Sequence, residues 1–165
     1  MIKIFIIIFL IVSISFRFAQ DKNEVTKIDK IKLEKLIKEN KEKVIFINVW
    51  ATWCKPCVQE FPDIVKLYDK YNKEIEFISL SVDFGKNPEE QVQQFLQKQN
   101  AKFKSFLIDE KSSEDIINYL NKDWSGAVPA TFIYDKSGIQ TAFMLGMQNY
   151  EDFEKEILMI KDNPK

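Results

Sequence analysis

The chain has 165 residues, the length of about one domain, and 45% of them are hydrophobic, enough to fill a core. Its 24 basic and 25 acidic residues nearly balance, so we expect no nucleic-acid partner, because binding to phosphates needs a basic surface. The chain has no histidine, which excludes Ser-His-Asp and Cys-His catalysis, histidine-ligated metals and haem on a proximal histidine. Its two cysteines, Cys54 and Cys57, are too few for a disulfide framework or a four-thiolate zinc site.

Residues 1–19 have the pattern of a secretory signal peptide, with Lys3 near the start, an apolar run and then small residues. A membrane-spanning helix needs about 20 apolar residues, and Arg17 ends the run before that length. We expect cleavage after Ala19, or alternatively after Ser15, and an exported protein, periplasmic or on the outer face of the cytoplasmic membrane. An uncleaved anchor and a buried N-terminal strand are the competing interpretations.

The rest of the chain predicts a flexible lead over residues 20–27 and one domain over residues 28–162. Strands are expected over 44–50, 75–82 and 104–108 and on both sides of the turn 135–138, and helices over 28–39, 55–71 and 112–120, after Asn87 and after Asn149. Helices alternating with strands, followed by a hairpin and a helix, predict an α/β protein whose mixed sheet is covered on both faces.

Local signals support these elements. Residues 44–50 are apolar except for Asn48, which is typical of a buried parallel strand. Side chains of Asn87, Ser112 and Asn149 are expected to cap the helices that follow them. The first helix is expected to bury a stripe of four aliphatic residues: Ile28, Ile31, Leu36 and Ile37.

The two cysteines stand where the strand over 44–50 gives way to the helix over 55–71. With Cys54 at the N-cap, its sulfur can accept a hydrogen bond from the amide of Cys57, because Pro56 has no N–H. The helix dipole and Lys55 also favour negative sulfur, and such surroundings lower a cysteine pKa to roughly 3.5 to 7.5. We therefore expect Cys54 to be the outer nucleophile, tuned by Lys55 and Pro56, and Cys57 the inner, resolving thiol.

Two other interpretations of this cysteine pair are weaker. A zinc site lacks its remaining ligands, since there is no third cysteine and no histidine, so we expect no metal and no cofactor. A purely structural disulfide between Cys54 and Cys57 would close only a short loop and constrain little of the unfolded chain. The strand-to-helix setting favours a redox role.

Three motifs occur in the order typical of the thioredoxin superfamily: the segment Val49–Cys57, Pro62 inside the following helix, and Val128–Thr131. Over residues 28–160 the chain resembles the exported, TlpA/ResA-like branch of thiol-disulfide oxidoreductases. The resemblance implies a thioredoxin-like three-layer α/β/α fold with a mixed central sheet, an antiparallel C-terminal hairpin and an extra strand-helix insertion over 104–120. The N-terminal hairpin often found in that branch is expected to be missing, because little chain lies between the signal and the first helix.

The resemblance also implies roles for the segment around Pro129. In the family the matching proline follows a cis peptide bond and lies against the cysteines, so Val128–Pro129 is expected to be cis. The backbone of Val128 would then pair with an extended substrate strand. The alternative is that Pro129 only opens an edge strand. Trp53 is expected to be exposed as a contact surface for partners, and Trp50 to lie in the core.

Two departures from the family bear on mechanism. Thioredoxin has a buried acid six residues before its first active cysteine, where this chain has Asn48. Glu60, one helical turn after Cys57, is the candidate proton acceptor, although a helical glutamate is often merely solvated. The second departure is the absence of histidine between the cysteines, where oxidases and isomerases of this fold commonly have one. Without that imidazole the pair favours reduction.

The leading hypothesis is an exported thiol-disulfide reductase that acts on protein disulfides through Cys54 and Cys57. Its partners would include apocytochrome c or other exported proteins and a membrane thiol electron donor, and we expect a monomer. Three alternatives remain: a dithiol oxidase or isomerase, a peroxiredoxin-type peroxidase, and a redox-inert module that binds extended peptides.

Overall fold

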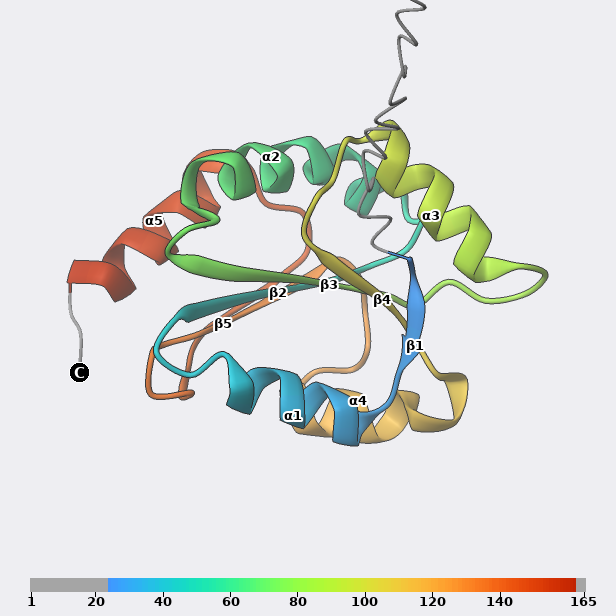
Figure 1. Ribbon diagram of the computed structural model, residues 1–165, viewed down its shortest axis with the longest axis horizontal. Helices are drawn as coiled ribbons and strands as arrows, with labels where there is room; N and C mark the ends of the chain where they lie inside the picture. The colour runs from blue at the N-terminus through green and yellow to red at the C-terminus, as the bar shows by residue number, and fades with distance from the viewer. Residues whose placement is uncertain (1–23, 163–165) are drawn as a thin grey trace, which may run out of the picture.

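A mixed six-stranded sheet lies at the centre of the computed structural model, which describes residues 24–162 (Figure 1). The expected signal peptide, with both cleavage sites, lies outside the described residues. The strands are β1 (Thr26–Ile28), β2 (Val44–Trp50), β3 (Ile75–Ser81), β4 (Lys104–Ile108), β5 (Ala130–Tyr134) and β6 (Gln140–Leu145). They are ordered β1-β4-β3-β2-β5-β6, with parallel pairing from β1 to β2 and antiparallel pairing of β5 with both β2 and β6.

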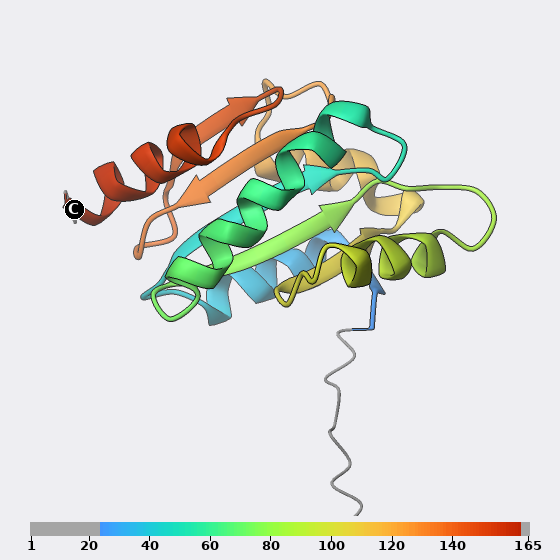
Figure 2. The same cartoon turned by 90° about the horizontal axis from the view of Figure 1, so that it is seen from above.

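Helices cover both faces of this sheet, and the predicted three-layer α/β/α fold is confirmed (Figures 1 and 2). They are α1 (Lys30–Glu39), α2 (Lys55–Tyr71), α3 (Pro88–Lys98), α4 (Ser113–Leu120) and α5 (Tyr150–Asp162), with a short 3₁₀ helix η1 (Glu110–Ser112) before α4. Helices α2, α3 and α5 pack on one face, and α1 and α4 pack on the other. Each face therefore has its own hydrophobic core.

Strand β2 positions the cysteines because it is held on both sides and buried on both faces. It pairs with β3 and β5 along its length, and all seven of its residues are buried. Phe46 and Trp50 belong to the core under α2, while Ile45 and Ile47 belong to the core over α1, as alternation along a strand requires. Both β2 and α2 have the bounds predicted from the sequence.

Residues 24–29, directly before α1, are more ordered than the expected flexible lead. Val25 is buried, and its N–H donates to Oε1 of Gln93 on α3 at 3.0 Å. Thr26–Ile28 then forms β1, which pairs with β4 in the predicted insertion, so the lead expected over residues 20–27 ends in a strand. The first helix accordingly begins at Lys30, after its N-cap Asp29, and Ile28 is a strand residue.

Several local expectations are corrected by the packing. Ile31 is 76% exposed, and Leu33 is buried instead, because α1 packs on the sheet through Leu33 and Ile37, which lie one turn apart on the same face of the helix. Asn87 precedes α3 with a positive φ and makes no side-chain cap bond, and Ser112 makes none before α4. Asn149 does cap α5, since its Oδ1 accepts from the N–H of Asp152.

Candidate active site

Four loops meet at one edge of the sheet. The parallel strands β2 and β3 both end there, and the loops that follow them carry Cys54 and Asp83. Strand β5 begins at the same edge, because Ala130 pairs with Val49 near the end of β2, and β6 ends there, because Leu145 pairs with Ala130. The carboxyl ends of parallel strands are the usual place for sites in open α/β sheets.

Cys54 and Cys57 form a disulfide at the amino end of α2. Cys54 is the N-cap, and its Sγ accepts a hydrogen bond from the N–H of Cys57 at 3.3 Å, the contact expected from the missing N–H of Pro56. Cys54 retains 6% exposure and Cys57 has none, while Lys55 and Pro56 are exposed. Of the two sulfurs, that of Cys54 lies nearer to solvent.

The loop before β5 lies against this disulfide. The Val128–Pro129 peptide bond is cis, and the Val128 carbonyl oxygen lies 3.7 Å from Sγ of Cys54. Pro129 is buried, and its carbonyl oxygen accepts from the N–H of Gly146 at 2.9 Å, which ties the loop to the end of β6. A half-buried Val128 thus presents backbone beside the outer cysteine.

An exposed aromatic pair lies next to the disulfide. Trp53 is 57% exposed, and its ring lies edge-on to that of Phe84, 64% exposed, with centroids 6.0 Å apart. Trp50, by contrast, is fully buried and donates from Nε1 to the Ser79 hydroxyl. Sequence reasoning missed Phe84, although a large apolar residue between Asp83 and Gly85, a few positions after a strand, is a detectable signal of an exposed loop.

Sequence reasoning also missed Asp83, which is 4% exposed. Its carboxylate accepts from the N–H and the hydroxyl of Thr52, two residues before Cys54, and from the hydroxyl of Ser81. These donors offset the cost of burying the charge. The contact joins the loop after β3 to the loop that carries the cysteines.

Glu60 is buried rather than solvated, with 1% of its surface exposed. Its Oε1 accepts from Nδ2 of Asn48 at 2.9 Å, and its Oε2 accepts from the N–H of Gln148 at 3.0 Å. Burial raises the pKa of Glu60 from 4.5 to about 7; the bonds from Gln148 and Asn48 lower this pKa, and the nearby charge of Asp63 raises it. A carboxyl with this pKa exchanges its proton near neutral pH.

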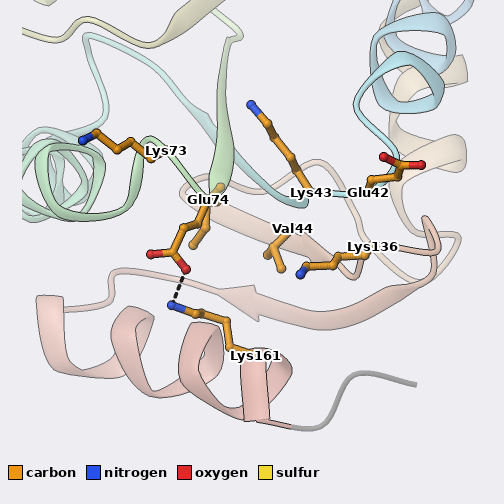
Figure 3. Close-up of a pocket in the computed structure, with 8 residues that line it drawn as sticks. Glu42, Lys43, Val44, Lys73, Glu74, Lys136 and Lys161 are labelled. Atoms are coloured by element: carbon orange, nitrogen blue, oxygen red, sulfur yellow. Dashed lines mark ion pairs between the residues drawn. The ribbon is translucent and has the colours of Figure 1, made fainter.

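The cavity drawn in Figure 3, of about 190 Å³, lies at the opposite edge of the sheet. It is formed where β2 and β3 begin and where β5 ends, and one ion pair, between Lys161 and Glu74, crosses it. Four lysines and two glutamates line it, with two aliphatic residues: Glu42, Lys43, Val44, Lys73, Glu74, Ile75, Lys136 and Lys161. This cavity is separate from the cysteines.

Among residues 24–162, no cluster of three or more potential ligands could hold a metal ion. Within the same residues, no helix combines the length and the apolar character needed to cross a membrane.

A disulfide-bonded cysteine pair at the amino end of a helix, beside a cis-proline loop on a three-layer α/β/α sheet, defines a thioredoxin-like thiol-disulfide oxidoreductase. The family model described as "AhpC/TSA family" matches residues 17–142, and the chain belongs to this family.

Curated relatives agree with this class. The chain is 31% identical over 129 residues to the thiol-disulfide oxidoreductase ResA of Geobacillus kaustophilus, covering 78% of this chain and 69% of that protein. It is 34% identical over 131 residues to the ResA of Bacillus cereus strain ZK / E33L, covering 79% of this chain and 69% of that protein. The predicted class of enzyme is thereby confirmed.

Solved structures support the fold. A thiol:disulfide interchange protein of the thioredoxin family from Chlorobium tepidum TLS superposes with a TM-score of 0.65 at 22% identity, over 74% of this chain and 83% of that one. A DsbF homologue from Corynebacterium diphtheriae superposes with a TM-score of 0.64 at 21% identity, over 74% of this chain and 75% of that one.

Proposed function

We propose that the protein is an exported reductase of protein disulfides that cycles between a Cys54–Cys57 dithiol and the disulfide. One observation carries the proposal: the outer sulfur of the pair caps α2 and lies 3.7 Å from the carbonyl oxygen that precedes cis-Pro129. In this position the Cys57 N–H favours a Cys54 thiolate, and the Val128 backbone can hold an extended substrate beside it.

The reaction is two successive thiol-disulfide exchanges. The Cys54 thiolate attacks one sulfur of the substrate disulfide, which forms a mixed disulfide and releases the other sulfur as a thiolate. Cys57 then loses its proton and attacks Cys54, which breaks the mixed disulfide and releases the second substrate sulfur. The substrate gains two electrons and two protons, and the two cysteines of the enzyme lose them.

Glu60 is the proposed proton acceptor for Cys57. The two residues are one turn apart on α2, both are buried, and a pKa of about 7 allows Glu60 to take a proton and release it near neutral pH. The proton would then return to a thiolate or to solvent as the product leaves.

We propose that substrates dock on the surface made by Val128, Pro129 and the exposed pair of Trp53 and Phe84. The relatives are named thiol-disulfide oxidoreductases and thiol:disulfide interchange proteins, which supports protein disulfides as the substrates. Apocytochrome c is a candidate among them, and a membrane thiol donor would restore the dithiol. The Lys55-Pro56 pair lacks the imidazole that makes such a pair oxidising, which supports the reductive direction.

Export is the second part of the proposal. Residues 1–19 fused to a phosphatase that folds only outside the cytoplasm should produce active enzyme, because a basic start and a short apolar run direct secretion. The N-terminal sequence of the secreted full chain should then begin at Gln20. A fusion that is as inactive as the phosphatase without residues 1–19 would contradict export.

Trapping tests the function and the order of the cysteines together. Cys57→Ser should accumulate mixed disulfides with protein partners through Cys54, because nothing remains to resolve them, whereas Cys54→Ser should accumulate none and lose turnover completely. The measurement is mass spectrometry of partners released by reductant, with Cys54→Ser as the matched control. Trapping through Cys57 in the Cys54→Ser variant would contradict the assignment.

The direction of electron flow is tested by the reduction potential. A reductase should lie close to the roughly −270 mV of thioredoxin, whereas a value near the roughly −120 mV of a strong dithiol oxidase would contradict the proposal. Equilibration of the purified protein with defined glutathione ratios measures it. Consumption of peroxide without any protein disulfide would instead indicate a peroxidase.

A further inference from the structure

Asn48 contains a buried polar atom for which the described residues provide no partner. The residue lies in the middle of β2, is 2% exposed, and donates from Nδ2 to Oε1 of Glu60 at 2.9 Å and to the Thr131 hydroxyl at 3.1 Å. Its Oδ1 is the one buried side-chain oxygen or nitrogen of residues 24–162 that makes no hydrogen bond. Buried acceptors are normally satisfied, so this exception calls for a physical explanation.

The contacts of Glu60 supply that explanation. Both of its carboxyl oxygens accept hydrogen bonds, from Nδ2 of Asn48 and from the N–H of Gln148, which suits the ionised form. A Glu60 O–H directed at Nδ2 of Asn48 or at the amide of Gln148 would meet an N–H, which cannot accept it. The N–H of Gln148 is fixed in the backbone, but a carboxamide exchanges its NH₂ and its oxygen by a half-turn about one bond.

After such a half-turn, Oδ1 of Asn48 would face Glu60 and could accept from its O–H. The Thr131 hydroxyl, which now accepts from Nδ2, could donate to the same Oδ1, because a hydroxyl can serve either way. The unpartnered Oδ1 of Asn48 is therefore the acceptor that a protonated Glu60 requires, and a half-turn of the carboxamide would bring it to Glu60.

We propose that Asn48 positions Glu60 in both protonation states, donating from Nδ2 when Glu60 is ionised and accepting at Oδ1 when Glu60 carries a proton. The role of this switch in thiol exchange rests on the proposed function of Glu60 as proton acceptor. A leucine at position 48 could serve neither state, and an aspartate could not donate while ionised.

Several neighbouring groups favour or disfavour the ionised form of Glu60. Asn48 on β2 and the N–H of Gln148 before α5 favour the ionised form, and Asp63 on α2 disfavours it. Thr131 on β5 is bonded to Asn48, and Cys57 lies one turn before Glu60 on α2; neither side chain is charged while Cys57 is in the disulfide. In the oxidised protein, Glu60 can thus be titrated without interference from a thiol.

The test is nuclear magnetic resonance of the oxidised full-length protein, with the Glu60 carboxyl carbon and the Asn48 side-chain NH₂ followed from pH 4 to pH 9. We expect the Asn48 NH₂ signals to move with the same midpoint as the Glu60 carbon, because the NH₂ of Asn48 stops donating to Glu60 when Glu60 becomes protonated. Asn48 signals that stay constant through the Glu60 transition would overturn the switch, and this measurement needs no variant.

Asn48→Leu gives a second, independent result. The Glu60 midpoint should rise by about 0.5 to 1 pH unit, because the lost bond to the ionised form is charge-assisted and stronger than the lost bond to the neutral form. Asn72→Leu removes the same residue type from the far end of α2 and should leave the midpoint unchanged. An Asn48→Leu midpoint equal to that of Asn72→Leu would overturn the proposal.

A swapped pair tests the switch in thiol exchange. Glu60→Gln should shift the pH profile of Cys57 alkylation in the reduced protein, and Asn48→Asp/Glu60→Gln should restore it, since carboxyl and amide have changed places. Asn48→Leu/Glu60→Gln should not restore it. An unchanged profile in Glu60→Gln would overturn Glu60 as proton acceptor, whereas an unmoved Asn48 signal overturns the switch alone, so the two failures are distinguishable.

Discussion

Asp83 joins the loop after β3 to the loop that carries the cysteines. Its buried carboxylate accepts two hydrogen bonds from Thr52 and one from the Ser81 hydroxyl. The next residue in each loop, Phe84 and Trp53, then meets the other in an exposed edge-on contact. One polar and one aromatic contact, side by side, thus set the position of the chain directly before Cys54.

Replacing Asp83 by alanine should destabilise the protein and loosen this loop. The Thr52 N–H and two hydroxyls would lose their acceptor, so we expect a loss of about 2 kcal/mol in the free energy of unfolding, and a higher KM for protein disulfides. Urea unfolding and steady-state kinetics measure the two effects. Asp69→Ala makes the same charge change at an exposed position on α2 and should cost little; equal losses in both variants would disprove the role of Asp83.

At the scale of the elements, hydrogen bonds of Glu154 on α5 link this helix to α2. Its Oε1 accepts from Nζ of Lys70 at 2.7 Å, from the Tyr71 hydroxyl at 2.7 Å and from the Tyr150 hydroxyl at 2.6 Å. The bond from Lys70, then those from Tyr150 and Tyr71, lower the pKa of Glu154 from 4.5 to about 2. Helices α2 and α5, which lie on the same face of the sheet (Figure 2), are thereby linked through one carboxylate.

Glu154→Gln should lower the melting temperature at pH 7. Because the folded pKa of Glu154 lies below the unfolded value, its contribution is complete above about pH 4.5 and is lost as the pH falls to about 2. The difference between wild type and variant should therefore disappear near pH 2. Calorimetry across this range is the measurement, with Glu156→Gln on the same helix as control, and a constant difference down to pH 2 would refute the link.

At the scale of the whole molecule, two carboxyl groups change the stability of the fold with pH in opposite directions. Glu154, with its lowered pKa, makes the fold less stable as the pH falls below about 4.5. Glu60, with its raised pKa, makes the fold less stable as the pH rises from about 4.5 to about 7, because the folded state holds a proton that the unfolded state has released. The burial of Glu60 therefore costs stability between about pH 4.5 and pH 7.

Glu60→Gln should remove the loss of stability on the alkaline side. From pH 5 to pH 8 the free energy of unfolding of the variant should rise relative to wild type by up to about 3 kcal/mol, the value that corresponds to the upward pKa shift of Glu60. Urea unfolding at several pH values measures it. Parallel curves for the two proteins would show that Glu60 does not titrate with a raised pKa in the fold.

The sequence predicted those features that depend on neighbours along the chain. The bounds of β2 and α2 follow from an apolar run and from a cysteine followed by a proline at the helix start, and both agree with the structure. The stripe of α1 was predicted less well, because Ile31 and Leu33 are both aliphatic and the sequence does not say which one faces the sheet. Strand β1 was missed because its partner β4 is distant in sequence.

The sequence by itself determined the chemistry of this protein: two cysteines at a helix start, no histidine, and a proline segment with the family's spacing. Only the tertiary structure decided how those residues act. Docking of α2 on the sheet buries Glu60 against Asn48, and the meeting of loops after β2 and β3 places Asp83 against Thr52. Burial and long-range hydrogen bonds are properties of packed elements, so a pKa near 7 and an unpartnered amide oxygen appear only once the chain has folded.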